Sequence, residues 1–417
     1  MPASLAIQGG TPVRSDPFPS WPVYDERDRE RLIQVLESRR WAFEGPFERE
    51  FERAFAARHT SRDAVTVTNG TVALLLCLRA LGIKPGDEVI IPALTWVSTA
   101  TAVLEANAVP VMVDVDPRTF CIDPSAVAAA VTGRTVAIVP VHLYSCMADM
   151  DAIGELARKR GLAVIEDCAH AHGARWGHRG AGSLGHLGSF SFQMSKVMTA
   201  GEGGAVVSND RQLLDRIYSL KNCGRHDASR GTAILGGNHR LTEWQAAILL
   251  GQLDRLDSTL LQREAALSRL RELVRLLRGI AVVEDQPRVS QRPFYRLGFH
   301  YDKDAAGGIP LPRFIEAVRA EGVPIEPTYP PVYDNPLYHT THLTWYPNEV
   351  RRFHCAVAER VSADGAFMLP HEILLGSDAD LDDVAAAFGK VLEHPDEAAG
   401  LRSRLKDRAK GLLRTLR

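Results

Sequence analysis

The sequence has no long hydrophobic run and little cysteine. None of its apolar stretches approaches the ~20 residues that cross a bilayer as a helix, and its first residues lack the apolar core of a signal peptide. We therefore expect a cytoplasmic protein with no membrane partner. Six cysteines are scattered over 417 residues without a Cys-x-x-Cys pair. This spacing argues against a zinc site or a disulfide framework, and we expect each cysteine to be a small buried apolar residue.

The sequence also lacks an excess of charge of either sign. Its formal net charge is −2, with 24% charged and 45% hydrophobic residues. This composition is typical of a globular enzyme, and no electrostatic argument favours a nucleic-acid partner. Repeats and low-complexity segments are also missing, and the length allows two or three domains.

Strand and helix signals alternate along the first half of the chain. A helix over 24–37, capped by Asp25, and a helix over 46–58, with Phe47, Phe51 and Phe55 on one core face, come first. We then expect strands at 64–68, 88–93, 109–115, 135–141, 162–167, 189–193 and 205–209, with helices at 72–81, 98–106, 124–130 and 150–160. Near-continuous apolar strands alternating with helices predict an α/β domain with a mostly parallel sheet covered on both faces.

From residue 241 the sequence changes character. A long helical run with room for one break precedes a strand over 294–301, a helix over 312–321 and a proline-rich loop over 324–336. The basic segment 401–417 reads as an amphipathic helix, for which a solvated surface or a subunit contact outweighs a membrane role. We predict an N-terminal arm (1–20), a large α/β domain (21–250) and a smaller α+β domain (251–417).

Three sites in the large domain together point to a cofactor. Lys196 lies between a short strand and the glycine-rich turn TAGEGG; taken alone, such a lysine is more often a surface residue of a hairpin. Asp167 ends the buried strand LAVIED, at the sheet edge where ligands bind. Asn69-Gly70-Thr71 joins a strand to a helix N-terminus, which favours a phosphate. A phosphate cradle, a buried carboxylate and a lone lysine are the equipment for pyridoxal phosphate.

A metal is a weaker reading of the same region. His170 and His172 follow Asp167 on one loop, but no third ligand has suitable spacing, so we predict no metal.

At this point the sequence resembles the DegT/StrS-type sugar aminotransferases, which are fold type I pyridoxal phosphate enzymes. The resemblance covers nearly the whole chain and rests on segments in order, from GPFEREFERAFA through TNGTVAL, GDEVIIPALTWVSTA, VHLYSCMADMDAI, IEDCAHAHGA and FSFQMSKVMTAGEGGAVV to GNHRLTEWQAAIL. It implies a large domain with a mostly parallel, seven-stranded-type sheet covered by helices, followed by the smaller C-terminal domain.

The resemblance also implies a role for individual residues. Lys196 would form the Schiff base and act as the base for the proton shift, and Asp167 would pair with the pyridine nitrogen. His170 would bond the phenolic oxygen, and Trp96 would stack on the ring. The phosphate would be held by Gly70, Thr71 and Ser191, with Asn238 reaching in from a second subunit. That last role implies a homodimer whose active site both subunits complete.

The substrate is less constrained by the motifs. Phrases such as HLYSCMADMDAI and LPHEILLG are similar to the aminocyclitol branch, which resembles L-glutamine:scyllo-inosose and L-glutamine:2-deoxy-scyllo-inosose aminotransferases of antibiotic pathways. The donor would be L-glutamine or L-glutamate. A nucleotide-linked keto-sugar, another natural-product ketone or aldehyde, and an aromatising aminohydroxybenzoate-synthase-type reaction stay open. Relatives that act on nucleotide sugars commonly carry a His-Gly pair where this chain has residues 222–225, so the resemblance implies no nucleotide contacts here. The candidate substrate contacts are Arg225, His226, Arg240 and Tyr329.

Overall fold

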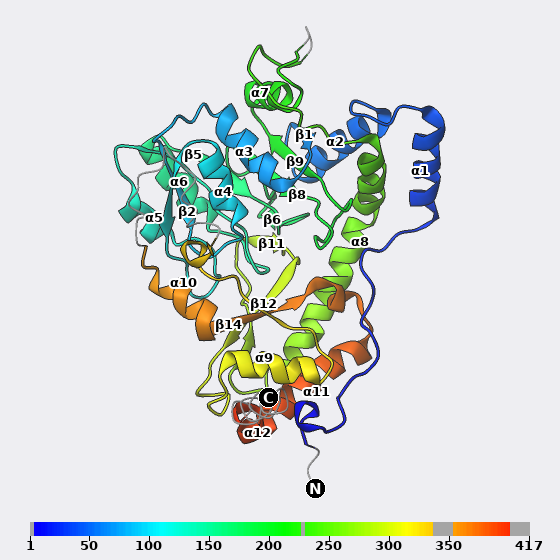
Figure 1. Ribbon diagram of the computed structural model, residues 1–417, viewed down its shortest axis with the longest axis vertical. Coiled ribbons are helices and arrows are strands. Elements are labelled where there is room, and N and C mark those ends of the chain that lie inside the picture. Colours follow the sequence, from blue (N-terminus) through cyan, green and yellow to red (C-terminus); the bar gives the residue numbers. More distant parts are fainter. Residues whose placement is uncertain (1–3, 227–229, 337–352, 401–417) are drawn as a thin grey trace, which may run out of the picture.

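A seven-stranded sheet is the framework of the fold (Figure 1). The computed structural model describes residues 4–226, 230–336 and 353–400. The strand order is β1-β9-β8-β5-β4-β2-β3, and β9 alone runs antiparallel to its neighbours. The predicted mostly parallel sheet is therefore confirmed. The strands are β1 (Asp63–Val67), β2 (Glu88–Pro92), β3 (Val109–Val113), β4 (Thr135–Ile138), β5 (Ala163–Asp167), β8 (Leu187–Ser191) and β9 (Gly204–Ser208).

Helices cover this sheet on both faces. Every residue of β2, β8 and β9 is buried, and successive residues of a strand point to opposite faces. The helices that pack around the sheet are α2 (Pro46–Arg58), α3 (Gly70–Ala80), α4 (Ser98–Glu105), α5 (Pro124–Ala130), α6 (Met150–Arg160) and α7 (Arg211–Lys221).

A second, antiparallel sheet forms the core of the C-terminal part. Its order is β10-β12-β14-β13, built from β10 (Ile280–Val282), β12 (Arg296–Tyr301), β13 (Glu326–Pro327) and β14 (Ala366–Pro370). It is accompanied by α9 (Leu311–Ala320), α10 (Ala356–Arg360), α11 (Asp378–Glu393) and α12 (Pro395–Ala399). A three-stranded sheet of β6 (Arg175–Trp176), β7 (Arg179–Gly180) and β11 (Val289–Gln291) links the two parts of the chain.

The long helix α8 (Glu243–Val274) connects the two parts (Figure 1). It contacts α2 and α1 (Glu26–Ser38) at one end and α11 and β10 at the other. It spans residue 250, where we predict the domain boundary, and that division stays a prediction. The N-terminal arm lies on the C-terminal part, because the Ala6 N–H donates to Glu321 Oε1 at 2.7 Å.

Helices with a clear start signal were predicted well. α2, α5 and α6 have the predicted bounds, and Asp25 caps α1 as expected. The predicted start of α3 at residue 72 is wrong: α3 begins at Gly70, because Asn69 Oδ1 accepts the Val72 N–H at 2.9 Å and closes the first turn. The long helical run, for which the sequence left room for one break, forms the single continuous helix α8 over Glu243–Val274.

Two expectations about burial were only partly correct. Phe51 and Phe55 are fully buried, whereas Phe47 is half-buried at the start of α2. Five cysteines are buried, but Cys223 is exposed. None of the described helices is both long and apolar enough to cross a membrane. The predicted helix at 401–417 lies outside the described residues.

Candidate active site

A cavity of about 830 Å³ lies at the carboxyl edge of the large sheet. Segments that follow β1, β2, β4, β5 and β8 line it, together with residues from β12 and β13 of the C-terminal part. It gathers eight of the side chains singled out in the sequence: Gly70, Thr71, Trp96, Asp167, His170, Ser191, Lys196 and Tyr329. Residues that are distant along the chain thus share one site.

Lys196 lies on the loop between β8 and β9, as the sequence predicts. Its side chain is buried, and its Nζ stands 3.8 Å from the centroid of the Tyr295 ring. Burial lowers the pKa of Lys196 below its ordinary value, although Tyr295 and Asp167 partly oppose this. A larger share of its amine is therefore neutral and nucleophilic than in a free lysine.

Asp167 is the last residue of β5, with its carboxylate on the floor of the cavity. Oδ2 accepts the hydroxyl of Thr99 at 3.0 Å and Oδ1 accepts the Ala169 N–H at 3.1 Å. Burial raises the pKa of Asp167, and these two hydrogen bonds oppose that rise. A cation bound in the cavity would stabilise the ionised form of this buried carboxylate.

The first turn of α3 meets the end of β8 at one corner of the cavity. A Cβ at Gly70 would stand 2.6 Å from Ser191 Cβ, so only glycine permits this approach. The N–H groups of Gly70 and Thr71 belong to the first turn, which has no acceptor within the helix. His172 supports the corner, because its Nε2 contacts the Ser191 carbonyl oxygen at 2.8 Å. The corner can therefore hold a phosphate.

Aromatic side chains form the mouth of the cavity. Trp96 is 56% exposed, and its ring centroid is 5.5 Å from that of Tyr329. The Tyr329 hydroxyl lies 3.5 Å from His170 Nε2. Burial holds the pKa of His170 well below its ordinary value, and its buried Nδ1 has no hydrogen-bond partner. Because His170 lines the cavity, its unpartnered ring nitrogen is a candidate contact for a polar ligand atom.

Three further residues line the cavity that sequence reasoning missed. The Lys196 amine lies over the ring of Tyr295, and the Tyr295 hydroxyl lies 2.7 Å from Ser195 Oγ. Arg296 and Glu326 form an ion pair of 3.1 Å at the wall. Their only signal in the sequence is the placement of polar residues at the starts of the strand over 294–301 and the loop over 324–336.

Four predicted site residues do not line this cavity. Arg225, His226 and Asn238 are exposed, and Asn238 pairs with Asn222 in an isolated bridge. Arg240 donates to Asn222 Oδ1 at 3.1 Å. Arg225, His226 and Arg240 thus lie away from the cavity of one chain, and their contact with a substrate stays a prediction. The assignment of Asn238 to a second subunit stays a prediction.

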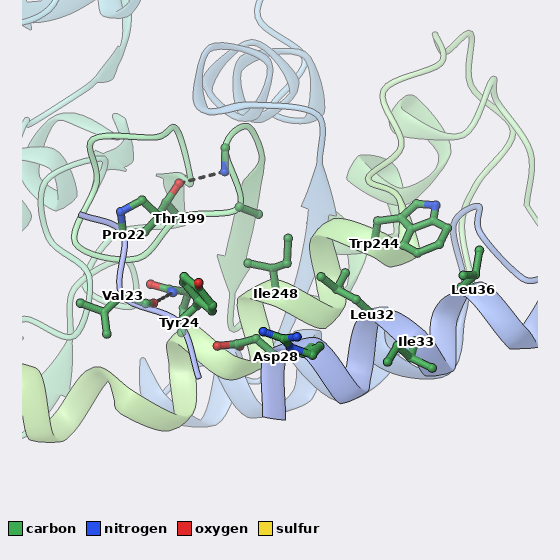
Figure 2. Close-up of a pocket in the computed structure, with 14 residues that line it drawn as sticks. Pro22, Val23, Tyr24, Asp28, Leu32, Ile33, Leu36, Thr199, Trp244 and Ile248 are labelled. Carbon is green, nitrogen blue, oxygen red and sulfur yellow. Dashed lines mark hydrogen bonds between the residues drawn. The ribbon is translucent and has the colours of Figure 1, made fainter. Parts of the chain in front are cut away.

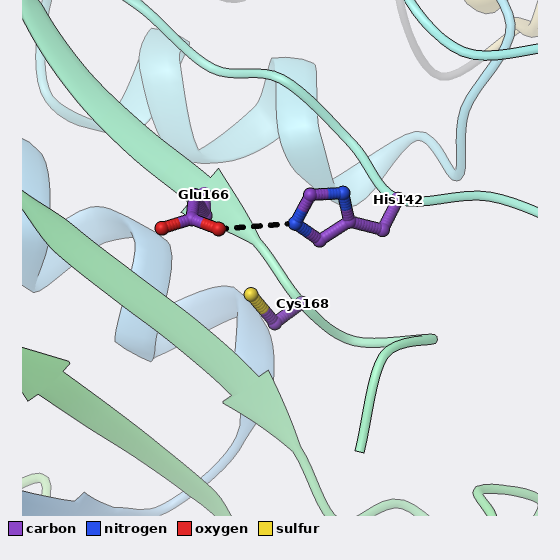
Figure 3. Close-up of side chains that lie close together, drawn as sticks. All are labelled: His142, Glu166 and Cys168. Atoms are coloured by element: carbon purple, nitrogen blue, oxygen red, sulfur yellow. Dashed lines mark hydrogen bonds and ion pairs between the residues drawn. The ribbon is translucent and has the colours of Figure 1, made fainter. Parts of the chain in front are cut away.

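A buried cluster of His142, Glu166 and Cys168 lies behind Asp167 (Figure 3). These residue types can bind a metal, but the ring nitrogens of His142 and both carboxylate oxygens of Glu166 are already hydrogen-bonded. His142 Nε2 contacts Glu166 Oε2 at 3.1 Å, and the two Glu166 oxygens also accept the N–H groups of Gly182, Leu184 and Gly185. His142 Nδ1 accepts the Ala148 N–H. Burial raises the pKa of the Cys168 thiol well above its ordinary value. Through these hydrogen bonds the cluster joins the end of β5 to the segments 142–148 and 182–185.

A second buried cluster braces the loop that carries Lys196. Arg263 of α8 is fully buried and donates from Nη2 to His371 Nδ1 at 3.0 Å. An acceptor at Nδ1 puts the proton on Nε2, which donates to the Ser195 carbonyl oxygen at 3.0 Å. Trp21 packs edge-on against His371 and donates to the Met194 carbonyl oxygen at 3.1 Å. The C-terminal part of the chain is thereby bonded to the residue next to Lys196.

A family model of the DegT/DnrJ/EryC1/StrS aminotransferases matches residues 22–389. The chain belongs to this family. It is therefore an aminotransferase, as the motifs predict, and the predicted fold class is confirmed by solved structures. The DegT/DnrJ/EryC1/StrS match spans both parts of the chain and every residue that lines the cavity.

Curated members of the family are similar over nearly their whole length. An L-glutamine:2-deoxy-scyllo-inosose aminotransferase of Streptoalloteichus tenebrarius is 41% identical over 95% of this chain and 99% of its own. An L-glutamine:scyllo-inosose aminotransferase of Streptomyces griseus is 38% identical over 96% of this chain and 100% of its own.

Solved structures give the same fold. That of 3-amino-5-hydroxybenzoic acid synthase has a TM-score of 0.82 at 35% identity, covering 91% of this chain and 100% of that one. That of DesI in the presence of its TDP-sugar product has a TM-score of 0.83 at 30% identity, covering 97% and 99%.

Proposed function

We propose that this aminotransferase uses pyridoxal phosphate to move an amino group from L-glutamine, or L-glutamate, to a keto-cyclitol such as scyllo-inosose or 2-deoxy-scyllo-inosose. The single observation that carries the aminotransferase chemistry is the buried Lys196 with its lowered pKa, in one cavity with the buried carboxylate of Asp167. The acceptor class is supported by the relatives named for those two keto-cyclitols. The reaction would belong to an aminoglycoside-type antibiotic pathway.

The cavity fits pyridoxal phosphate at four separate points. Asp167 offers a buried anion to the pyridine nitrogen, and the Gly70–Thr71 turn with Ser191 offers a cradle to the phosphate. His170 Nδ1 is a buried nitrogen without a partner, available to the ring's oxygen substituent. Trp96, exposed at the mouth, offers an aromatic face for the ring. Bound there, the cofactor supplies an electron sink and a carrier for the amino group.

The protein's own residues then do the proton chemistry. Lys196 would hold the cofactor covalently, and once released its neutral Nζ would take the proton from the donor's α-carbon. Its burial favours the neutral amine. Asp167 would stay ionised beside a cation, because the Thr99 hydroxyl and the Ala169 N–H stabilise its charge.

We also infer that the working unit is a homodimer, with Asn238 contributed to the partner's cavity. An apolar groove of about 670 Å³ lies between α1, the segment 22–24, the loop 199–201 and the start of α8 (Figure 2). Leu36 is 54% exposed and Ile33 47% exposed along it. The groove includes Thr199, three residues from Lys196, so a second copy seated there would adjoin the active site.

A cytoplasmic location completes the proposal. The six cysteines are all free, and five of them are buried. Free thiols are typical of proteins from a reducing compartment.

The solved relatives support two alternatives to a keto-cyclitol acceptor. DesI was solved with a TDP-sugar product, and 3-amino-5-hydroxybenzoic acid synthase is similarly close in fold. A nucleotide-linked keto-sugar or an aromatising reaction is thus the alternative to a keto-cyclitol.

A product assay tests the proposal. The holoenzyme is incubated with L-glutamine and each of scyllo-inosose, 2-deoxy-scyllo-inosose and a nucleotide-linked keto-sugar, and the amino products are weighed by mass spectrometry. An aminocyclitol from one of the first two is expected. An amino product from the nucleotide sugar alone would overturn the keto-cyclitol assignment, and an aromatic product would favour the synthase reaction.

A further inference from the structure

Arg296 is a cation of the cavity that the proposed chemistry leaves without a task. Among the described residues that line the cavity, Lys196 and Arg296 are the only lysine and arginine. His170 is neutral, because burial keeps its pKa well below the ordinary value. Lys196 is committed to the cofactor. Arg296 is therefore the positive charge that one chain offers to a substrate.

Arg296 is held at the wall by residues of the small sheet. It pairs with Pro370 of β14 in register, and Glu326 pairs with Met368 of the same strand from the other side. The ion pair of 3.1 Å from Nη1 to Glu326 Oε1 thus reaches across β14. The Arg296 side chain is 16% exposed, and that of Glu326 is 37% exposed.

Arg296 is also close to the reacting centre. Its guanidinium carbon stands 5.1 Å from the centroid of the Tyr295 ring, the same ring that carries Lys196 Nζ at 3.8 Å. The carboxylate of an α-amino acid is attached to the carbon that carries the reacting amine. A group that binds this carboxylate must therefore lie close to the reacting amine, and Arg296 and Lys196 both line the cavity and both contact the Tyr295 ring.

The two substrates of the proposed function differ in charge. The donor, L-glutamine or L-glutamate, carries an α-carboxylate, whereas a keto-cyclitol is an uncharged polyol. The same cavity must accept both in turn. A lone arginine would suit the donor, but it would be left buried without an anion while the polyol is bound.

We infer that Arg296 binds the α-carboxylate of the amino donor, and that Glu326 neutralises the guanidinium whenever the uncharged acceptor fills the cavity. This inference rests on the proposed function. A guanidinium has five donors, so it can offer a forked pair to the donor carboxylate and keep a contact with Glu326. The ion pair then serves as the part of the site that tells the amino acid from the polyol.

The test compares two donors on the purified holoenzyme. One is L-glutamine and the other its α-amide, which lacks the carboxylate. The variants are R296M/E326Q, which removes both charges and leaves no buried ion unpaired, and R288M/D151N, a matched pair on the surface with its ions 2.8 Å apart. The absorbance of the bound cofactor reports each half-reaction, and the melting temperature reports folding.

The wild type and R288M/D151N should prefer L-glutamine by about 100-fold in kcat/KM, which is about 2.7 kcal/mol. R296M/E326Q should react with both donors within about 3-fold of each other, and its aminated form should still react with the keto-cyclitol. A variant that keeps the 100-fold preference overturns the inference, even where glutamine reacts with the wild type. A wild type that accepts no amino-acid donor overturns the proposed function as well.

Discussion

A buried carboxylate without a cation in hydrogen-bond contact is costly, and Asp167 is such a group. Burial raises its pKa, and the hydrogen bonds from Thr99 and the Ala169 N–H, with the nearby Lys196 and His142, oppose this rise only in part. The environment of Asp167 is therefore set for a positively charged ligand atom, which a protonated pyridine supplies.

The first prediction concerns Asp167→Asn. The amide cannot pair with a cation, so the dissociation constant of pyridoxal phosphate should rise at least ~30-fold, or about 2 kcal/mol. Turnover should fall by at least ~100-fold, since the electron sink is weakened. Cofactor titration by fluorescence measures the first effect. D151N on the exposed end of α6 is the control, and a D167N protein with wild-type affinity and spectrum would refute the pairing.

The second prediction concerns Gly70→Ala. The added Cβ would stand 2.6 Å from Ser191 Cβ and push α3 away from β8, so phosphate binding should weaken at least ~10-fold while the fold persists. Gly154→Ala in α6 is the matched control, because nothing lies within 4 Å of its Cβ. G154A should be neutral or more stable by about 0.5–1 kcal/mol. Equal cofactor affinities for G70A and G154A would contradict the cradle.

At the scale of elements, hydrogen bonds join the C-terminal part of the chain to the loop between β8 and β9 that holds Lys196. α8 supplies Arg263, the segment after β14 supplies His371, and the loop between β8 and β9 supplies the Ser195 carbonyl. Burial lowers the pKa of Arg263 to about 10. A hydrogen bond to a carbonyl next to Lys196 restricts where its amine can move.

The third prediction therefore concerns His371. H371L leaves the Ser195 carbonyl and the Arg263 guanidinium without their partner, which should cost about 3 kcal/mol of unfolding free energy. Turnover of the cofactor-loaded enzyme should fall at least ~10-fold. H371Q keeps a donor and an acceptor and should recover most of both. Urea unfolding measures stability, and the pH profile of turnover measures the positioning of Lys196. Equal pH profiles for H371L and the wild type would contradict a positioning role for His371.

Local signals explain why some elements and residues could be predicted. α2 and α5 begin at a proline and α6 follows a capping Asp149, so their bounds follow from sequence. Lys196 and Asp167 stand at the ends of strongly apolar strands. Arg296 and Glu326 were missed because they meet across β14, and pairing of distant strands leaves no local pattern. The start of α3 was misplaced because Asn69 was read as part of a turn instead of as a cap.

At the scale of the whole molecule, burial of neutral histidines ties stability to pH. Burial lowers the pKa of His59 and His172 to about 3, and that of His170 and His371 well below 6.5. An unfolded histidine titrates near ~6.5. Below that pH the unfolded chain binds protons that the folded chain does not, so acid favours unfolding.

The fourth prediction follows with this sign. The free energy of unfolding should be flat with respect to these groups above about pH 7 and should fall between pH 6.5 and 5, by up to ~1.4 kcal/mol per pH unit for each histidine. Denaturant unfolding at pH 7.5 and 5.5 measures the drop. H59Q should reduce it, because one such group is gone, whereas H178Q at an exposed position should not. A drop that H59Q leaves unchanged would contradict this origin.

The fifth prediction tests the homodimer. Leu36→Glu places a charge in the apolar groove of Figure 2 and should shift the protein from dimer to monomer in analytical ultracentrifugation. Activity should fall with the dimer, since Asn238 is proposed to act in the partner's cavity. Leu276→Glu, at a position 78% exposed and outside the groove, is the control. A fully active L36E monomer would reject the shared site.

The central claim is that Lys196 catalyses the transfer of an amino group from an amino acid to the cofactor. One measurement tests this claim without knowledge of the acceptor. The holoenzyme is treated with L-glutamine labelled with ¹⁵N at the α-amine, the protein is denatured, and the released cofactor is weighed. The account predicts an aminated cofactor that carries ¹⁵N from the wild type and none from K196A. An unlabelled or unchanged cofactor from the wild type with both L-glutamine and L-glutamate, or a labelled one from K196A, would contradict it.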